Sequence, residues 1–350
     1  FFSFLFLLLL GLFFSFSSTS PIVGDKLDKE TYFFFIKHLT YVLLSIFIII
    51  FISFQNKELI EKYLLAIFLV TLFFLILVPL IGVEVKGSKR WLDLKILPRF
   101  QPIELIKPFF ILLIVKVILN QRAKNIYFNY FYSFMILTLL AVLLIMQPDL
   151  GQMLLISTTW ISIVFVSGVN LFYFIFFALF FVIIITLIIF LFPSKLGYIF
   201  LRLKTFLDPT KGDNFQSQKA IEAIKQGGLT GEGLGEGILK ERIPEAHTDY
   251  IISVISEEFG IIFILLIISI YLFIAFKVFN KVFTNNKSDF VKLSLIGLTT
   301  ILILQAFIHI GVNIRLFPTT GITMPFISYG GSSLVGTSLI SGIIINFTKK

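Results

Sequence analysis

Long apolar runs separated by short polar stretches dominate this chain. Ten of them are long enough, or nearly so, to cross the hydrocarbon core of a bilayer, which takes about 20 residues of helix. They cover residues 1–17, 33–54, 62–82, 104–119, 130–147, 151–167, 171–192, 250–276, 293–312 and 327–347. Hydrophobic residues make up 57% of the chain and charged residues only 14%, far outside the range of soluble domains. The sequence therefore predicts an all-α integral membrane protein, a single polytopic domain over residues 1–350 with ten transmembrane helices.

The composition also restricts the kind of site that the chain can carry. It has no Cys, so neither a disulfide framework nor a thiolate metal centre is possible, and three His make a His-rich metal centre unfavourable. We expect no metal site built from protein side chains. The net charge of +9 suits anionic lipid head groups or a phosphorylated substrate. Because the chain begins without Met and inside an apolar run, we expect an N-terminal piece to precede it.

Residues 241–260, ERIPEAHTDYIISVISEEFG, place the densest group of ionisable side chains directly before an apolar run. We predict that the helix begins at Tyr250, with Asp249 in its first turn at the water-exposed mouth. The residues that share a helix face with Asp249 form one narrow polar stripe: Ser253, Ser256, Glu257 and Gly260. A carboxylate in apolar surroundings loses hydration and becomes a better proton acceptor, so Asp249 is a functional candidate. The alternative, that it only caps the helix dipole, stays open.

Two further segments combine charge with turn residues. Residues 83–107 gather Lys and Arg around Trp91, which is typical of a piece that lies at the membrane interface and binds a polar lipid head, or of side chains that merely snorkel there. Gln147-Pro148-Asp149-Leu150-Gly151 interrupts an apolar block and predicts a sharp turn at one membrane face. Outside the long loop 193–248, Lys and Arg divide almost evenly between the two sides, so charge does not orient the chain.

The loop from 193 to 248 is far longer than a passive connection. It contains GGLTGEGLGEG, residues 227–237, which matches a dinucleotide-binding motif only by its letters, because no strand precedes it. We predict tightly turned or flexible backbone there, at the edge of a site. After it, residues 313–331 lead into a last helix whose small residues predict close helix packing.

Four blocks, in this order along the chain, resemble the SEDS family of bacterial cell-wall proteins, which comprises FtsW, RodA and a sporulation homologue. They are GSKRWLDL with FQPIELIK (87–94 and 100–107), QPDLG (147–151), IPEAHTDYI with SEEFG (243–251 and 256–260), and PFISYGGSSL (325–334). The Ala of PEAHTD resembles the FtsW branch more than the RodA branch. Two positions depart from the family pattern: Ile103 replaces a Ser, and Thr320 replaces a Lys common in the FtsW branch.

The resemblance implies a ten-helix peptidoglycan glycosyltransferase in the bacterial cytoplasmic membrane, at the division septum if the FtsW branch is right. It implies that the chain polymerises lipid II at the outer face and releases undecaprenyl diphosphate. The large loop between helices 7 and 8, residues 193–249, would then face the periplasm. The expected partners are a class B penicillin-binding protein and other divisome membrane proteins, and no nucleic acid. A divalent cation, Mg²⁺ or Mn²⁺, is the one cofactor that we consider.

The resemblance also assigns roles to individual residues. Asp249 matches the family's catalytic Asp and becomes the base for the acceptor's 4-hydroxyl. Its neighbours Glu245 and His247 are expected to shape the site. The candidates for binding the substrate's diphosphate are Lys89 and Arg90, with Lys107 and Arg315 as weaker ones. Asp149 and Glu104 are expected to orient basic side chains or to bind the acceptor.

Four alternative functions remain at this stage. A lipid II flippase or other transporter also needs polar groups among membrane helices, but it should spread them along a path through the bilayer. Here they crowd into 83–107 and 241–249, and the helix centres are mostly apolar, which favours an enzyme at the interface. An O-antigen ligase or polymerase is the second alternative, because it performs similar chemistry on other lipid-linked sugars. A purely structural divisome scaffold is the third, and it would have no need for Asp249. A RodA-type polymerase of cell elongation is the fourth.

Overall fold

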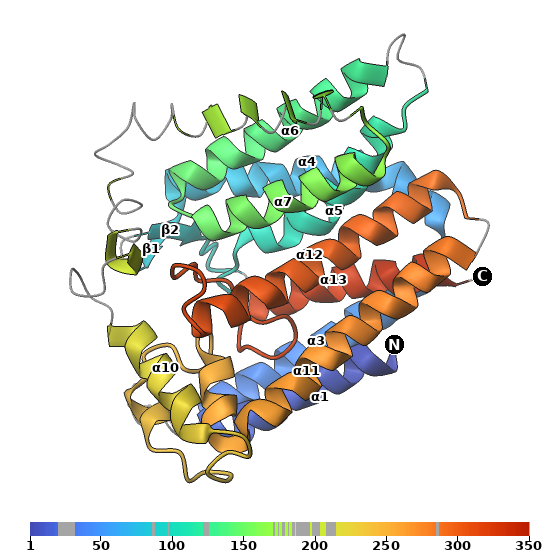
Figure 1. Ribbon diagram of the computed structural model, residues 1–350. Coiled ribbons are helices and arrows are strands. Elements are labelled where there is room, and N and C mark those ends of the chain that lie inside the picture. Colours follow the sequence, from blue (N-terminus) through green and yellow to red (C-terminus); the bar gives the residue numbers. More distant parts are fainter. Residues whose placement is uncertain are drawn as a thin grey trace. The chain divides into compact units, whose positions relative to one another are not determined.

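The computed structural model in Figure 1 describes residues 1–19, 32–85, 88–96, 98–121, 126–170, 215–284 and 287–349, with scattered helical residues between 172 and 207. Helices make up most of this described part. Its α-helices are α1 (Phe2–Phe14), α3 (Phe33–Ser53), α4 (Lys57–Ile81), α5 (Pro102–Ile118), α6 (Ile126–Met146), α7 (Leu150–Val166), α10 (Phe215–Gly227), α11 (Ile251–Thr284), α12 (Asp289–Asn313) and α13 (Gly331–Thr348). The shorter elements are the π-helix η1 (Ser15–Thr19), the 3₁₀-helix η2 (Leu239–Arg242) and the strands β1 (Val83–Val85) and β2 (Ser88–Trp91).

Six of the described helices are long and apolar enough to cross a membrane: α3, α4, α6, α11, α12 and α13. The shorter α1 and α7 are also apolar. Large apolar side chains lie exposed along these helices, as expected where lipid replaces water. Every predicted span except 171–192 coincides with a described helix. That span falls mostly outside the described residues, so the count of ten helices and the limits of the long loop stay predictions.

The chain divides into two compact units, each assembled from segments far apart in the sequence. The first unit contains residues 1–52, 201–277 and 302–342, and the second contains 53–200, 278–301 and 343–350. The single domain over 1–350 therefore remains a prediction.

In the first unit, the N-terminal helix packs against a segment near the other end of the chain. Gly11 of α1 lies so close to the backbone of Phe326 and Ile327 that a Cβ atom would overlap it. The rings of Phe4 and Phe326 pack beside this contact, with their centroids 5.6 Å apart. The lack of a side chain at Gly11 thus allows the close approach of α1.

In the second unit, α5 is buried along nearly its whole length and packs against α4, α6 and α7 (Figure 1). Gly297 of α12 approaches this core closely, because a Cβ atom there would lie 2.7 Å from a side-chain carbon of Ile111. The two short strands pair antiparallel in a hairpin, with Glu84 opposite Lys89. This hairpin forms the first part of the basic segment 83–107, which leads into α5.

Candidate active site

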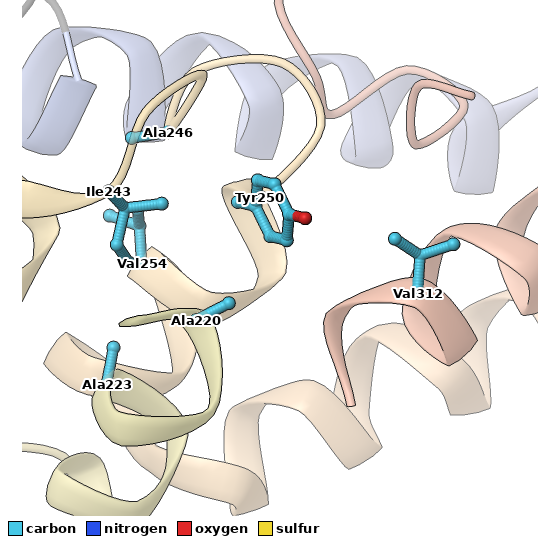
Figure 2. Packing of buried hydrophobic residues seen from close by; sticks show 7 residues of the cluster. All are labelled: Ala220, Ala223, Ile243, Ala246, Tyr250, Val254 and Val312. Carbon is cyan, nitrogen blue, oxygen red and sulfur yellow. The ribbon is translucent and has the colours of Figure 1, made fainter. Parts of the chain in front are cut away.

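A turn of eight residues, 243–250, carries Asp249 in the first unit. Its apolar members Ile243, Ala246 and Tyr250 are buried in a cluster with Ala220, Ala223, Val254 and Val312, which come from α10, α11 and α12 (Figure 2). Its ionisable members lie between them in the sequence and are only half-buried: Glu245, His247 and Asp249. The apolar cluster therefore holds the turn in place while Asp249 itself stays only half-buried.

The backbone of this turn is held by the last residue of α12 and by the segment that follows it. Three consecutive carbonyl oxygens, those of residues 247–249, accept hydrogen bonds from three different donors. These donors are the backbone N–H of Tyr329 at 3.0 Å, Oγ of Ser328 at 2.7 Å and Nδ2 of Asn313 at 2.9 Å. Because each bond restrains one peptide unit, the Cα–Cβ direction of Asp249 is well defined before any substrate binds.

Asn313 uses both ends of its side-chain amide in this arrangement. Its Oδ1 accepts from the backbone N–H of Ser253 at 3.2 Å and from Oγ of Ser253 at 2.8 Å. Its Nδ2 donates to the carbonyl of His309 at 2.8 Å as well as to that of Asp249. One buried amide therefore joins the end of α12, the beginning of α11 and the Asp249 backbone.

Glu245 and His247 lie in the same turn as Asp249, and their role in shaping the site stays a prediction. The carbonyl of Glu245, a residue with φ of 57°, accepts from the backbone N–H groups of residues 248–250 at 3.1 to 3.2 Å and closes the turn. Its carboxylate accepts from Oγ1 of Thr248 at 3.0 Å. The ring of His247 lies between aromatic neighbours, with centroids 5.8 Å from Phe34 and 5.7 Å from Tyr329.

The beginning of α11 differs from the prediction. Because the Glu245 carbonyl takes up the N–H groups of 248–250, these residues form a turn of their own, and α11 begins at Ile251. The expectation of Asp249 in the first helical turn is therefore wrong: Asp249 precedes it. α11 also runs on to Thr284, beyond the predicted end at 276.

The polar face predicted for α11 packs against the glycine-rich loop. α11 breaks at Gly260, whose φ of 73° and ψ of 178° are not helical. Backbone hydrogen bonds of 2.9 to 3.3 Å join the break to the loop: Glu232 N to Glu257 O, Gly233 N to Glu258 O, Ile261 N to Gly228 O and Ile262 N to Leu229 O. A Cβ atom on Gly231 or Gly260 would overlap the opposing backbone. The tightly turned backbone predicted for 227–237 is confirmed, since several of its glycines have positive φ.

The second unit contains a separate polar cluster, which we call the Asp149 cluster: Arg90, Gln101, Glu104, Lys107, Asp149 and Gln152. The predicted sharp turn at 147–151 is confirmed, and Asp149 caps α7 by accepting from the backbone N–H of Gln152 at 3.4 Å. Nη2 of Arg90 donates to the carbonyl of Pro148, and Nη1 of Arg90 lies 3.7 Å from Oδ1 of Asp149. Gln101 donates to Oδ2 of Asp149 at 3.0 Å. Burial raises the pKa of Asp149, and the nearby Arg90 opposes that shift.

Gln152 joins this carboxylate to a buried ion pair. Its side-chain amide donates to Oε1 of Glu104 at 2.6 Å. Oε2 of Glu104 pairs with Nζ of Lys107 at 2.6 Å, one turn further along α5. Both charged side chains of this pair are almost completely buried. Asp149 and Glu104 thus each contact a basic side chain, Arg90 and Lys107 respectively, and the roles considered for them stay predictions.

The remaining predicted residues lie outside these contacts. Lys89 is exposed on β2, and Arg315 is half-buried in the turn after α12, with a positive φ of 58°. Asn313, Gln101 and Gln152 were missed as site residues. An N-cap pattern, Asp149 with a polar residue three positions later, was the one signal that pointed to Gln152. Among the residues that the structure describes, no group of three His, Cys, Asp or Glu side chains is placed to hold a metal ion.

These features define the class of the protein: it is a multi-pass helical membrane protein whose ionisable groups gather at turns. The family model described as cell cycle protein, which covers FtsW, RodA and SpoVE, matches residues 1–350. The chain therefore belongs to the FtsW, RodA and SpoVE family.

Curated relatives match over nearly the whole chain. A probable peptidoglycan glycosyltransferase FtsW of Caulobacter vibrioides is 31% identical, over 98% of this chain and 87% of that protein. The protein with the same description from Haemophilus influenzae is 32% identical, over 99% and 88%. That from Nitrosomonas europaea is 33% identical, over 97% and 89%.

Solved structures show the same fold. A chain from work on the structural coordination of polymerization and crosslinking by a peptidoglycan synthase complex superposes with a TM-score of 0.80 at 22% identity, over 99% of this chain and 96% of that one. The rod shape determining protein RodA of Thermus thermophilus gives a TM-score of 0.68 at 21% identity, over 99% and 94%.

Proposed function

We propose that this chain is a peptidoglycan glycosyltransferase that polymerises lipid II, with Asp249 as its general base. The curated FtsW relatives support the class of reaction. The observation that carries the assignment of the base is the turn at 243–250, where hydrogen bonds from residues 313, 328 and 329 fix the backbone on both sides of a half-buried carboxylate. A general base needs this combination of fixed position and access to the reacting hydroxyl.

The reaction requires one proton transfer and one charged leaving group. Asp249 takes the proton from the 4-hydroxyl of the acceptor's terminal GlcNAc. The hydroxyl oxygen forms a bond to the anomeric carbon of the donor sugar as the bond between that carbon and the diphosphate oxygen breaks. Undecaprenyl diphosphate leaves with the electron pair of the broken bond, and cations stabilise the charge that develops on it.

We assign the leaving diphosphate to Lys89 and Arg90, with Lys107 and Arg315 as weaker candidates. Lys89 is exposed beside Arg90 on β2. The two guanidinium groups each keep a buried nitrogen, Nε of Arg90 and one terminal nitrogen of Arg315, without a hydrogen-bond partner among the described residues. Lys107 is a weaker candidate because Glu104 already balances its charge. A divalent cation, Mg²⁺ or Mn²⁺, stays part of this proposal as a second source of positive charge on the diphosphate. Among the described residues no group of three His, Cys, Asp or Glu side chains could hold such an ion without the substrate.

The cellular setting is part of the same proposal. The chain is a multi-pass membrane protein, which we place in the cytoplasmic membrane at the division septum with ten helices. Residues 193–249 then face the periplasm, where lipid II is polymerised. The similarity to a chain of a peptidoglycan synthase complex supports a class B penicillin-binding protein as partner, and other divisome proteins complete the assembly.

The test is polymerisation of purified lipid II, with the strands separated by gel. Wild type, Asp249→Asn and Asp289→Asn are each assayed with a partner transpeptidase whose crosslinking Ser has been removed. Asp289 is an exposed Asp in the first turn of α12 and serves as the matched control. We expect long strands from wild type and control, and a loss of about 10²- to 10⁴-fold in rate for Asp249→Asn. Equal rates for Asp249→Asn and wild type would overturn the base, and lipid II crossing liposomes without strand formation would favour a transporter.

A further inference from the structure

We propose that Glu257 is a positioning residue for Asp249 and acts by holding the chain segment that leads into the Asp249 turn. This inference rests on the proposed function, because it concerns the same base. Glu257 lies on the part of α11 that precedes the break at Gly260, eight residues after Asp249. Its side chain is completely buried, and the mechanism described above does not use it.

The carboxylate of Glu257 binds the first residues of η2. Its Oε1 accepts from the backbone N–H of Leu239 at 2.6 Å, and its Oε2 accepts from that of Lys240 at 2.7 Å. The first N–H groups of a helical turn have no partner within that turn, so Glu257 supplies a cap from another element. Bonds from N–H groups to a charged carboxylate are about twice as strong as neutral ones.

A second carboxylate, that of Glu258, binds the side chain of Lys240. The ammonium group of Lys240 pairs with Oε1 of Glu258 and donates to the carbonyl of Gly235 at 3.0 Å. Glu258 also accepts from the backbone N–H of Gly235 at 3.3 Å. Lys240 is therefore held through both its backbone and its side chain by two successive residues of α11.

These contacts tie both ends of residues 239–257 together, because Glu257 of α11 binds the residues at the beginning of this segment. Residues 239–242 rest on Glu257, the turn at 243–250 follows at once, and α11 then brings the chain back to Glu257. The far end of the loop is held by Tyr329, Ser328 and Asn313. Without the Glu257 contact, the segment that precedes Asp249 is anchored less firmly, and a shift of about 1 Å at a reacting group can cost on the order of 100-fold in rate.

Two variants disturb this contact in different ways. Glu257→Gln replaces one acceptor oxygen by an NH₂ group that faces a backbone N–H. Gly237→Ala keeps the Glu257 residue unchanged but introduces a Cβ atom 2.8 Å from its Cδ. The Glu257 carboxylate must therefore move away from Leu239 and Lys240. Glu236→Gln, an exposed position on the same loop, is the matched control. If Glu257→Gln folds poorly, Gly237→Ala carries the test.

The variants are compared in the lipid II assay with the partner transpeptidase and by hydrogen exchange. For Glu257→Gln and Gly237→Ala we expect kcat to fall on the order of 10- to 100-fold with KM changed less than about twofold. The amides of Leu239 and Lys240 should exchange faster, while those of α12 and α13 stay protected. The double variant Asp249→Asn/Glu257→Gln should be no slower than Asp249→Asn alone, because both changes affect one base.

Unchanged kcat in both variants would overturn the proposal. Faster exchange spread evenly over the unit would also overturn it, because that result means general destabilisation, as would a double variant that multiplies the two losses. If wild type makes no strands, the proposed glycosyl transfer fails instead, and the exchange of Leu239 and Lys240 still reports whether Glu257 holds the loop.

Discussion

The Asp249 turn and the Asp149 cluster both contain an Asp at the beginning of an apolar helix, yet their surroundings differ. Asp149 is almost completely buried, caps α7 and lies beside Arg90, and the neighbouring Glu104 and Lys107 neutralise each other. Asp249 is half-buried, and hydrogen bonds to the backbone of its turn help to hold it in position. A buried carboxylate that is neutralised by its neighbours is suited to a structural role. A half-buried Asp on a fixed backbone is suited to meet a substrate.

Removing one partner of the buried ion pair should have the largest effect on stability. Lys107→Met leaves the carboxylate of Glu104 buried without its cation, which should lower the free energy of unfolding by about 3 to 5 kcal/mol. Denaturant titration in detergent micelles measures this change. Adding Glu104→Gln should restore most of the stability, because the amide can still bond to Gln152. A double variant as unstable as Lys107→Met would show that packing, and not the unpaired charge, is responsible.

Asn313→Ala should affect stability less but activity more. It removes the amide that binds Ser253 and the carbonyls of Asp249 and His309, at a cost of about 1 to 3 kcal/mol for the groups left unsatisfied. The polymerisation rate per folded molecule should fall by about tenfold or more, because the Asp249 peptide loses one of its restraints. Thermal unfolding and the lipid II assay on the same preparation separate the two effects. Undiminished activity in folded Asn313→Ala would contradict the idea that the backbone positions the base.

Asp149→Asn should change how the stability of the protein depends on pH. Burial raises the pKa of Asp149 in the folded protein, so its stabilising contribution is fully present below the ordinary Asp pKa and is lost as the pH rises through the raised value. The stability of wild type relative to Asp149→Asn should therefore decrease with rising pH. Melting temperatures of both proteins across the acidic and neutral range test this, with Asp289→Asn as the control. A difference that stays constant with pH would mean that Arg90 cancels the effect of burial.

The smallest effect is expected at a surface ion pair beside the same hairpin. Asp93 accepts from Nε of Arg99 at 2.8 Å, and this contact lowers the pKa of Asp93, but Arg99 is exposed and Asp93 is only half-buried. Water and salt screen such pairs, so Asp93→Asn should leave the melting temperature and the polymerisation rate unchanged within error. A clear loss of activity with normal stability would place Asp93 in the substrate site instead.

Much of the fold follows from local chemistry and was predictable. Apolar runs of sufficient length predicted the described helices except α10, which lies within the predicted loop 193–248, and Pro148 with Asp149 predicted the turn between α6 and α7. The polar group around Asp249 was also visible, because it precedes an apolar run. These features depend on residues adjacent in the sequence, so a periodic pattern or a breaker is enough to reveal them.

The contacts that complete the site depend on residues far apart and were not predictable. Gln152 bonds to Glu104 over 48 residues, and Asn313 bonds to the Asp249 carbonyl over 64. Backbone carbonyls have the same chemistry at every residue, so no pattern marks those of 247–249 as acceptors. The glycines of 227–237 predicted tight turns, but not that the loop would fill a break in α11 at Gly260.

The close contact between Gly11 and Phe326 has a consequence for how the protein is made. A ribosome adding about 5 to 20 residues per second needs on the order of 15 to 60 seconds to reach Phe326 after α1 has emerged. During that time α1 lies in the bilayer without the backbone of Phe326 and Ile327, against which it packs in the folded protein. Assembly of the first unit is therefore completed only after its last segment has been translated, and a chain truncated before Phe326 lacks the backbone that Gly11 contacts.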